Sequence, residues 1–259
     1  MRQILLPGDL RGTGIFRLDQ KTAHYLRDVR RMQSGAVFPV VDEKGNRFLA
    51  TLRCLKSGEA EVLLEPKEAP QAEELEEPCL LALVQALPKG QKFDLIIRQA
   101  VELGTSLIVP LITRFCVARE SSDEAEAKLE RRKRIIREAL QQSGSSILTE
   151  ITAAVMPDRL EQVLSAHGFS QRESTRIVFH ESAGGTLPSL HEILADSPGR
   201  VVVCIGPEGG FSSEDMEALG ELGFVAYHAS GPIMRTETAA LFALSSIRTL
   251  MLERSTWKH

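Results

Sequence analysis

From Cys79 to the end of the chain, continuous apolar runs alternate with stretches that have the period of an amphipathic helix. The apolar runs occupy residues 79–86, 106–113, 176–180, 200–206 and 224–229, and the helical stretches occupy residues 92–104, 126–143, 212–223 and 236–252. Uninterrupted apolar runs are typical of strands buried on both faces, and strands that are joined through helices pair in parallel. This part of the chain is therefore predicted to be an α/β domain whose mostly parallel sheet carries helices on both faces.

The first part of the chain has a different pattern. Short strands separated by turn signals are predicted at residues 15–18, 36–42, 47–55 and 60–65, with one helix at residues 22–32. Residues 66–78 then contain three prolines and five glutamates but one leucine, a composition typical of an exposed connector. We therefore predict a small β-rich domain at residues 1–68, a linker at 69–78 and the α/β domain at 79–259.

Composition narrows the class of protein. A hydrophobic fraction of 43% and a charged fraction of 25% are ordinary for a globular protein and argue against disorder. No apolar run approaches the length of a membrane span, and residues 1–12 lack the features of a secretory signal. The four cysteines show no CxxC spacing and no paired histidines accompany them, which favours reduced thiols over a metal site. We expect a cytoplasmic protein that binds no metal and no membrane.

Charge gives a weaker indication of the partner. The chain has a net charge of −4, but residues 1–68 hold 12 basic and 9 acidic residues. Arg27, Arg30 and Arg31 cluster in this segment. Such a cluster is either an ordinary solvated face, which is the commoner case, or a contact for RNA phosphates.

The first of two glycine-bearing loops, Ile205 to Ser212, follows the apolar run at 200–206 and leads into the helix predicted at 212–223. Gly206, Gly209 and Gly210 allow positive φ and a close approach of backbone to a ligand. Ligands of α/β proteins bind at the carboxyl ends of strands. The loop matches neither GxGxxG nor GxxxxGK, which argues against dinucleotide and P-loop sites. Taken alone, it is more typical of a tight turn than of a binding site.

The second loop begins at Ala229 and leads into the last helix. Thr236 or Thr238 is expected to cap that helix, and Glu237 favours its positive end. Arg235 precedes the helix, where its charge opposes the helix dipole. This position indicates that Arg235 has another role, or that it is a surface arginine paired with Glu237 or Glu208.

Together the two loops are far more specific than either alone. The segments IGPEGGFS and SGPIMRTETAALFAL closely resemble the signature of the ribosomal RNA small subunit methyltransferase E family, in the SPOUT superfamily. The resemblance covers the whole chain, and includes MRQILL, AHYLRDVRRMQSG, VVDEKGNRFLA, LPKGQKFDLIIRQAVELGTSLIVPLIT and EALQQSG. Departures from the family pattern stand at Cys116, at Ser230, and at the positions after QSG, where Ser145, Ser146 and Thr149 stand in place of an arginine and a proline.

The resemblance implies a trefoil-knotted α/β methyltransferase domain of the SPOUT type, preceded by a small β-rich PUA-like RNA-binding domain. It implies a homodimer that methylates N3 of a uridine in 16S ribosomal RNA of the small ribosomal subunit, with S-adenosylmethionine as cofactor. The last helix agrees with a dimer, because Phe242, Leu244, Ile247, Leu250 and Met251 offer more apolar surface than one core face needs. The expected cofactor-binding residues are His180, Gly206, Glu208, Gly209, Gly210, Ser230, Gly231, Ile233, Met234 and Thr236.

The chemistry of uridine N3 suggests further roles. N3 carries a proton and becomes a good nucleophile only when that proton leaves. We expect Arg235 to stabilise the resulting negative charge and Glu237 or Glu208 to act as the base or to orient the arginine. The sequence does not choose between the two carboxylates, and His180 is expected to be a wall residue more than a proton carrier.

Two alternatives remain at this point. A non-catalytic RNA-binding ribosome assembly factor on the same scaffold is expected to have lost the loop glycines or the RTET segment, and both are present here. A ribose 2′-O-methyltransferase is expected to have a second loop rich in Ser and Asn, which is absent.

Overall fold

The computed structural model describes residues 3–8, 10, 14–56, 59–66, 79–117, 122–145, 147–181, 187–196 and 198–253. The chain divides into two compact units, Met1–Leu75 with Leu140–Leu148, and Glu76–Ala139 with Thr149–His259. Each unit has its own sheet. The predicted linker at 69–78 lies outside the described residues, so the domain boundaries at 68 and 79 stay predictions.

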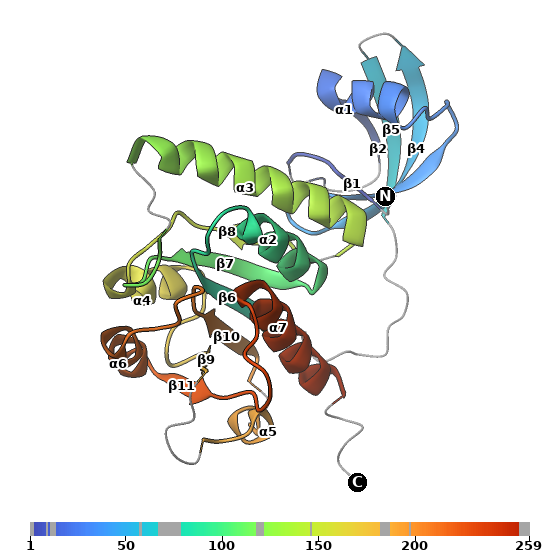
Figure 1. The fold of residues 1–259 in the computed structure, drawn as a ribbon. Helices are drawn as coiled ribbons and strands as arrows, with labels where there is room; N and C mark the ends of the chain where they lie inside the picture. The colour runs from blue at the N-terminus through green and yellow to red at the C-terminus, as the bar shows by residue number, and fades with distance from the viewer. Residues whose placement is uncertain are drawn as a thin grey trace. The chain divides into compact units, whose positions relative to one another are not determined.

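The sheet of the first unit has the strand order β1-β3-β4-β5-β2 (Figure 1). Its strands are β1 (Ile4–Leu5), β2 (Gly14–Leu18), β3 (Val37–Val41), β4 (Arg47–Lys56) and β5 (Glu59–Pro66). The β1–β3 pair is parallel, and the other pairs are antiparallel. Four strands were predicted, and β1 was missed because two residues are too few to show a period. Leu26, Leu52 and Val62 lie in the core of this unit.

The helix predicted at residues 22–32 is shorter and differently wound. Helix α1 (Gln20–His24) begins after Asp19, whose carboxylate accepts a hydrogen bond from Thr22 N at 2.8 Å. One π-helical turn, η1 (Tyr25–Val29), follows and ends where Arg30 N donates to Tyr25 O. A π turn holds more residues than an α turn, so Val29 rotates away from the face on which Leu26 is buried. Val29 is 60% exposed as a result.

The second unit contains a six-stranded sheet in the order β11-β9-β10-β6-β7-β8, in which neighbouring strands pair in parallel. The strands are β6 (Leu80–Ala86), β7 (Thr105–Leu111), β8 (Glu150–Ile151), β9 (Thr175–Phe179), β10 (Arg200–Ile205) and β11 (Phe224–Tyr227). The predicted parallel sheet is thus confirmed. Ile205 pairs with both Gln85 and Phe179, and Phe179 pairs with Tyr227. The carboxyl ends of four strands therefore meet at one edge.

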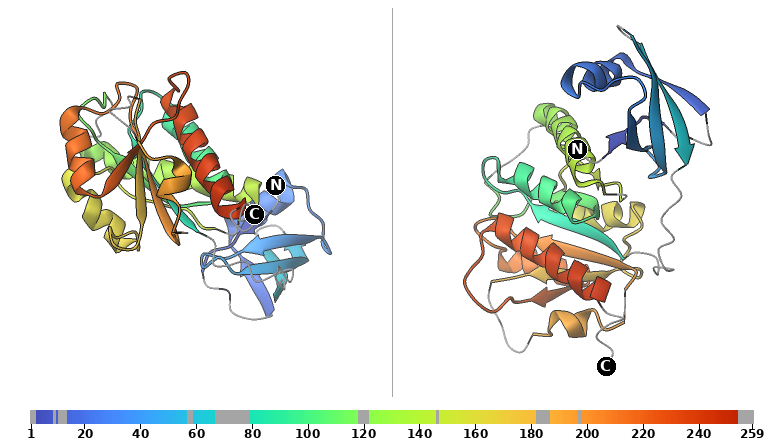
Figure 2. Two further views of the ribbon diagram at one scale, coloured as in Figure 1. Left: turned by 90° about the horizontal axis from the view of Figure 1, so that it is seen from below. Right: turned by 90° about the vertical axis from the view of Figure 1, so that its right-hand side faces the viewer.

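Helices cover both faces of this sheet, as predicted. Helices α2 (Lys92–Glu102) and α7 (Thr236–Glu253) lie side by side on one face, and α4 (Pro157–Ala166) and α6 (Ser213–Glu221) lie on the other (Figures 1 and 2). The remaining helices are α3 (Ser122–Ser143) and α5 (Leu190–Ile193). Helix α4 was not predicted, although a proline at its first position and leucines at 160 and 164 are helix signals. Ser212 and Asp215 form a capping box at the start of α6.

Helix α7 corrects one argument made from sequence. Leu244 and Ile247 are 1% and 0% exposed, so they belong to the core and offer no free apolar surface. Leu250 and Met251 are partly buried. Phe242 is 39% exposed, and Leu252 is 64% exposed. The excess of apolar surface on α7 is therefore smaller than the sequence suggested, because the helix packs against both the sheet and α2.

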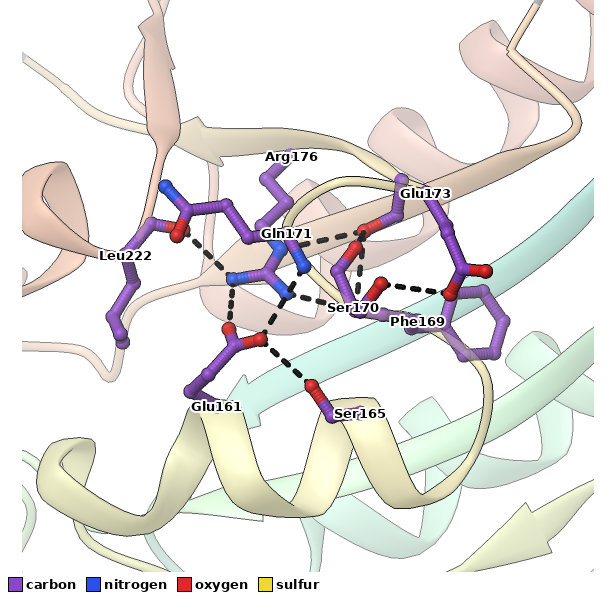
Figure 3. A network of polar contacts seen from close by, with 9 residues as sticks. Glu161, Ser165, Phe169, Ser170, Gln171, Glu173, Arg176 and Leu222 are labelled. Atoms are coloured by element: carbon purple, nitrogen blue, oxygen red, sulfur yellow. Dashed lines mark hydrogen bonds and ion pairs between the residues drawn. The ribbon is translucent and has the colours of Figure 1, made fainter.

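A buried arginine fixes the amino end of β9 (Figure 3). Arg176 is 2% exposed and donates to Glu161 Oε2 at 2.5 Å, Leu222 O at 2.8 Å and Phe169 O at 2.8 Å. These partners come from α4, from the end of α6 and from the segment that precedes β9. A fully hydrogen-bonded guanidinium is compatible with burial. The network holds the edge of the sheet opposite the one where the carboxyl ends meet.

Candidate cofactor and active site

A cavity of about 300 Å³ opens at the edge where the carboxyl ends of β9, β10 and β11 meet. This is the edge at which α/β proteins bind ligands. Both glycine-bearing loops line the cavity together with the ends of these strands. The lining residues are Phe179, His180, Glu181, Ile205, Gly206, Pro207, Glu208, Gly210, Phe211, His228, Ala229, Gly231, Pro232, Ile233, Met234, Arg235, Thr236 and Ala239.

The glycines of the first loop are required by close packing and backbone conformation. A Cβ on Gly206 would lie 3.2 Å from the ring of Phe211, and one on Gly209 would lie 3.0 Å from Cβ of Phe115. Gly210 has a φ of +68°, a conformation that favours glycine. Gly206 and Gly210 line the cavity, whereas Gly209 is not among the lining residues. The loop is thus both a tight turn and one wall of a cavity.

The second loop supplies the other wall. Gly231, Ile233 and Met234 line the cavity, whereas Ser230 is not among the lining residues. Gly231 has a φ of +129°, and the side chain of Ile233 is 79% exposed. The predicted cofactor-binding residues of this loop are therefore brought to the cavity apart from Ser230.

A buried hydrogen-bond chain joins the two loops through the centre of the sheet. Thr236 Oγ1 donates to Gly206 O at 2.7 Å and accepts from Gln85 Nε2 at 3.1 Å. Gln85 lies near the carboxyl end of β6 and is fully buried. Since α7 begins at Thr236, the residue before its first turn is Arg235, whose carbonyl accepts from Ala239 N. The Thr236 hydroxyl therefore fixes the first loop instead of capping α7.

A cluster of charged side chains lies beside the cavity. Lys92 Nζ is 2.6 Å from Glu208 Oε1 and 3.8 Å from Glu237 Oε2. The backbone N–H of Lys89 also donates to both oxygens of Glu208 at 3.2 Å. In the described part of the chain, the structure assigns the guanidinium of Arg235 no ion pair or hydrogen bond. The surface pairing of Arg235 with Glu237 or Glu208, left open by the sequence, is therefore not what the structure shows, because Lys92 takes both carboxylates.

The Lys92–Glu208 pair shifts the pKa values of both groups. Partial burial acts to raise the pKa of Glu208, but hydrogen bonds from Lys92 and from backbone N–H groups outweigh it, so this pKa lies below its ordinary value. The hydrogen bond to Glu208 raises the pKa of Lys92 above its ordinary value. Both shifts favour the charged forms, so the pair is ionised at neutral pH. A carboxylate stabilised in this way is a poor general base.

His180 is a wall residue of the cavity, as expected. Its backbone N–H donates to Tyr227 O at 3.0 Å, and its carbonyl is 3.2 Å from His228 Nδ1. These contacts connect the ends of β9 and β11.

Comparison with known proteins decides which family this site belongs to. A family profile described as an RNA methyltransferase domain matches residues 75–248, and one described as an RNA methyltransferase PUA domain matches residues 18–65. Ribosomal RNA small subunit methyltransferase E from Synechocystis is 32% identical over 231 residues, which are 88% of this chain and 71% of the relative. This chain belongs to the ribosomal RNA small subunit methyltransferase E family.

Solved structures agree with membership of the methyltransferase E family. Methyltransferase E from Neisseria gonorrhoeae, solved with S-adenosyl methionine, matches with a TM-score of 0.80 and 26% identity over 96% of this chain and 98% of that one. A putative methyltransferase from Legionella pneumophila, solved with the same cofactor, matches with a TM-score of 0.77 and 25% identity over 96% and 97% of the two chains. The predictions of the family, of a methyltransferase and of a SPOUT-type α/β fold after a PUA-like domain are confirmed. The threading of α7 through a knot stays a prediction.

The residues that depart from the methyltransferase E pattern make different contacts in the structure. Thr149 is buried, and its hydroxyl donates to Thr105 O at 2.7 Å, so it supports the fold. The hydroxyl of Ser145 donates to Ile147 O and accepts from Ile147 N. Ser146 lies outside the described residues. Cys116 is buried and its thiol lies 3.3 Å from the Thr113 hydroxyl.

The arginines predicted to bind RNA lie in the first unit, on and after η1. The side chain of Arg27 donates to both carboxylate oxygens of Asp28, at 2.9 and 2.7 Å. Arg30 and Arg31 are exposed, and Arg31 has a φ of +51°. One of the three charges is therefore already paired, and the other two face solvent.

Lys92 and Gln85 were not among the site residues predicted from the sequence. A signal existed for Gln85, since it is the one polar residue in the apolar run 79–86, and a buried amide needs a partner. For Lys92 no local signal exists, because its partner Glu208 is 116 positions away in the chain. Only the pairing of β6 with β10 brings the two residues together.

Metal-binding clusters and membrane-spanning helices are absent from the described residues. No group of three or more histidine, cysteine or acidic side chains there has a geometry that would hold a metal ion. Within the same residues, no helix is both long enough and apolar enough to span a membrane. Cys79, Cys116 and Cys204 are free thiols, and burial raises the pKa of Cys79 to about 11.

Proposed function

We propose that this protein transfers a methyl group from S-adenosylmethionine to N3 of a uridine in 16S ribosomal RNA of the small ribosomal subunit. The observation that carries the proposal is a cavity walled by both glycine-bearing loops, with Arg235 among its lining residues and the guanidinium of Arg235 unpaired within the described part of the chain. Relatives named as ribosomal RNA small subunit methyltransferases and solved structures that hold S-adenosylmethionine support it. A ribosomal substrate also favours a cytoplasmic location.

The residues present fit the cofactor. The cavity volume is at the lower end of the range for small-molecule sites. Its walls combine the apolar side chains of Ile233 and Met234 with backbone that approaches closely at Gly206 and Gly210, where no Cβ intrudes. When bound there, the cofactor supplies a methyl group on a cationic sulfur.

Arg235 has the chemistry that the substrate requires. When a methyl group replaces the proton on uridine N3, that proton must leave, and its loss spreads negative charge over O4, N3 and O2. A guanidinium stays charged at neutral pH and donates two parallel hydrogen bonds to a planar anion. Since the cofactor itself is cationic, an arginine beside it is better explained by the uridine anion than by cofactor binding.

Of the two carboxylates, Glu237 is the better candidate for the base. Glu208 is held ionised by Lys92 and by the Lys89 N–H. Glu237 is 17% exposed, and its Oε2 is buried with no hydrogen-bond donor among the described residues. The acceptor capacity of this oxygen is therefore not used by a hydrogen bond among the described residues, and Lys92 holds it only by an ion pair at 3.8 Å.

The test measures Arg235→Ala with labelled cofactor and small ribosomal subunits, followed by nucleoside analysis of the RNA. We expect N3-methyluridine from the unchanged protein and roughly a hundredfold loss of turnover in the variant, with little change in cofactor affinity. Arg235→Lys should recover only part of the loss, since an ammonium lacks the planar fork. Normal turnover of Arg235→Ala, or loss of cofactor binding with unchanged turnover at saturation, would show that Arg235 is structural.

The same assay separates the alternatives. A 2′-O-methylated nucleoside would mean a ribose methyltransferase. No methylated product from intact protein with bound cofactor would favour the non-catalytic assembly factor. That second function is not favoured, because both loops and the RTET segment are intact and the relatives are named as methyltransferases.

A further inference from the structure

Lys92 occupies the first position of α2, on the sheet face shared with α7. Its ammonium is 2.6 Å from Glu208 of the first loop and 3.8 Å from Glu237 in the first turn of α7. A single cation from a third element therefore interacts with a carboxylate of the first loop and with a carboxylate of α7. The Lys92 side chain is 35% exposed, so water only partly screens these interactions.

Both carboxylates depend on this lysine. Glu208 has one charged donor, Lys92, in addition to the Lys89 N–H. Glu237 has no hydrogen-bond donor on its buried Oε2, and the one cation that the structure places within 4.0 Å of it in the described chain is Lys92. Without Lys92, two nearby anions would lack a cationic partner.

In the absence of Lys92, Arg235 is the cation that we expect to pair with these carboxylates. It lies two residues before Glu237 and lines the same cavity as Glu208. The hydrogen bond to Glu208 raises the pKa of Lys92, and the charge of Arg235 opposes that rise to a smaller extent, so the two cations share one electrostatic neighbourhood. Guanidinium–carboxylate pairs are strong because two parallel hydrogen bonds form. An uncompensated carboxylate would therefore capture Arg235.

We propose that Lys92 is a positioning residue that engages Glu208 and Glu237 and so keeps Arg235 unpaired for the substrate. The inference rests on the proposed function, in which Arg235 stabilises the uridine anion. It assigns Lys92 no contact with the RNA or the cofactor. Its effect on turnover is indirect, through the availability of Arg235.

The first test is Lys92→Met, with Lys92→Arg and Lys128→Met beside it. Lys128→Met removes the same charge from an ion pair contained within α3. We expect Lys92→Met to lower kcat by roughly tenfold or more, on the scale of losing a preorganised charge, with cofactor affinity almost unchanged. Lys92→Arg should stay close to the unchanged protein, because a guanidinium also satisfies both carboxylates. Lys128→Met should have no effect on kcat.

The decisive variant is Lys92→Met combined with Glu208→Gln. Removing the carboxylate that captures Arg235 should raise kcat above that of Lys92→Met alone. If Lys92 only supports the fold, the second substitution adds damage, and the double variant is no better. Normal kcat of Lys92→Met, or a double variant that does not recover, overturns the proposal.

A measurement on the free protein gives an independent answer. Arg235→Ala should change the free energy of unfolding little when Lys92 is present, because the guanidinium has no partner among the residues that the structure describes. In the Lys92→Met background it should destabilise measurably, because Arg235 has become the partner of the carboxylates. Equal effects in the two backgrounds would contradict the inference. If Arg235→Ala turns over normally in the unchanged protein, the proposed function of Arg235 fails instead, whatever Lys92→Met does.

Discussion

Two neighbouring glycines of the first loop are needed for different physical reasons. Gly209 is needed because Phe115 fills the space a side chain would take, whereas Gly210 is needed because of its positive φ. A Cβ added at Gly210 would lie 3.3 Å from Glu181 Oε1, which belongs to a flexible side chain that can move away. Backbone conformation is thus the main constraint at Gly210.

Gly210→Ala tests whether the loop is a binding site as well as a turn. We expect a loss of about 1–2 kcal/mol in the free energy of unfolding, because an L-residue resists the left-handed conformation. Cofactor affinity should fall as well, since the backbone at Gly210 lines the cavity. Gly220→Ala is the matched control: Gly220 lies in α6 with open space around it, and alanine should stabilise by about 0.5–1 kcal/mol. Cofactor titration by calorimetry and urea unfolding measure both effects. Unchanged affinity in a destabilised Gly210→Ala would mean that the loop is only a turn.

Among the elements, η1 departs most from the regular helix that sequence periodicity predicted for its residues. Its π turn exposes Val29, and the chain then leaves with Arg30 and Arg31 turned to solvent. The hydrogen bonds of Arg27 to Asp28 leave these two as the more available cations. An exposed basic turn on a PUA-like domain is a reasonable contact for RNA phosphates.

Reversal of charge on η1 should weaken RNA binding in a way that depends on salt. We expect Arg30→Glu with Arg31→Glu to lower affinity for ribosomal RNA strongly at low salt and less at high salt, because each lost phosphate contact reduces counterion release. Adding Arg27→Glu should lower the affinity for RNA by a smaller amount, since Asp28 already neutralises Arg27. Fluorescence anisotropy with labelled RNA over a range of salt concentrations measures the slope. The same affinity loss at all salt concentrations would exclude phosphate contacts.

At the scale of the whole molecule, we propose that two copies of this chain form the active species. The support is the homodimer that the family resemblance implies, together with the exposed Phe242 and Leu252 on α7. Sedimentation velocity at micromolar concentration should give twice the mass of the chain, with a mass that does not fall on moderate dilution. A monomer with full methyltransferase activity would refute this prediction.

Local pattern was sufficient for most elements of this protein. Apolar runs without alternation identified the strands of the parallel sheet, and the period of apolar residues identified α2, α3, α6 and α7, because burial imposes these patterns directly on the sequence. The two glycine-bearing loops were also visible, since tight backbone turns require particular residue types. Short elements such as β1 and β8 and the π turn η1 were not, because a few residues cannot display a period.

Tertiary structure alone decided the electrostatics of the site. The sequence left Glu208 and Glu237 equivalent and left Arg235 with a possible surface partner. The parallel pairing of β6 with β10 carries Lys92 to Glu208 across 116 positions, and the packing of α2 beside α7 brings it near Glu237. Strand order and helix packing are long-range properties that no local period encodes. For that reason the charge pattern that leaves Arg235 unpaired appears only in the folded chain.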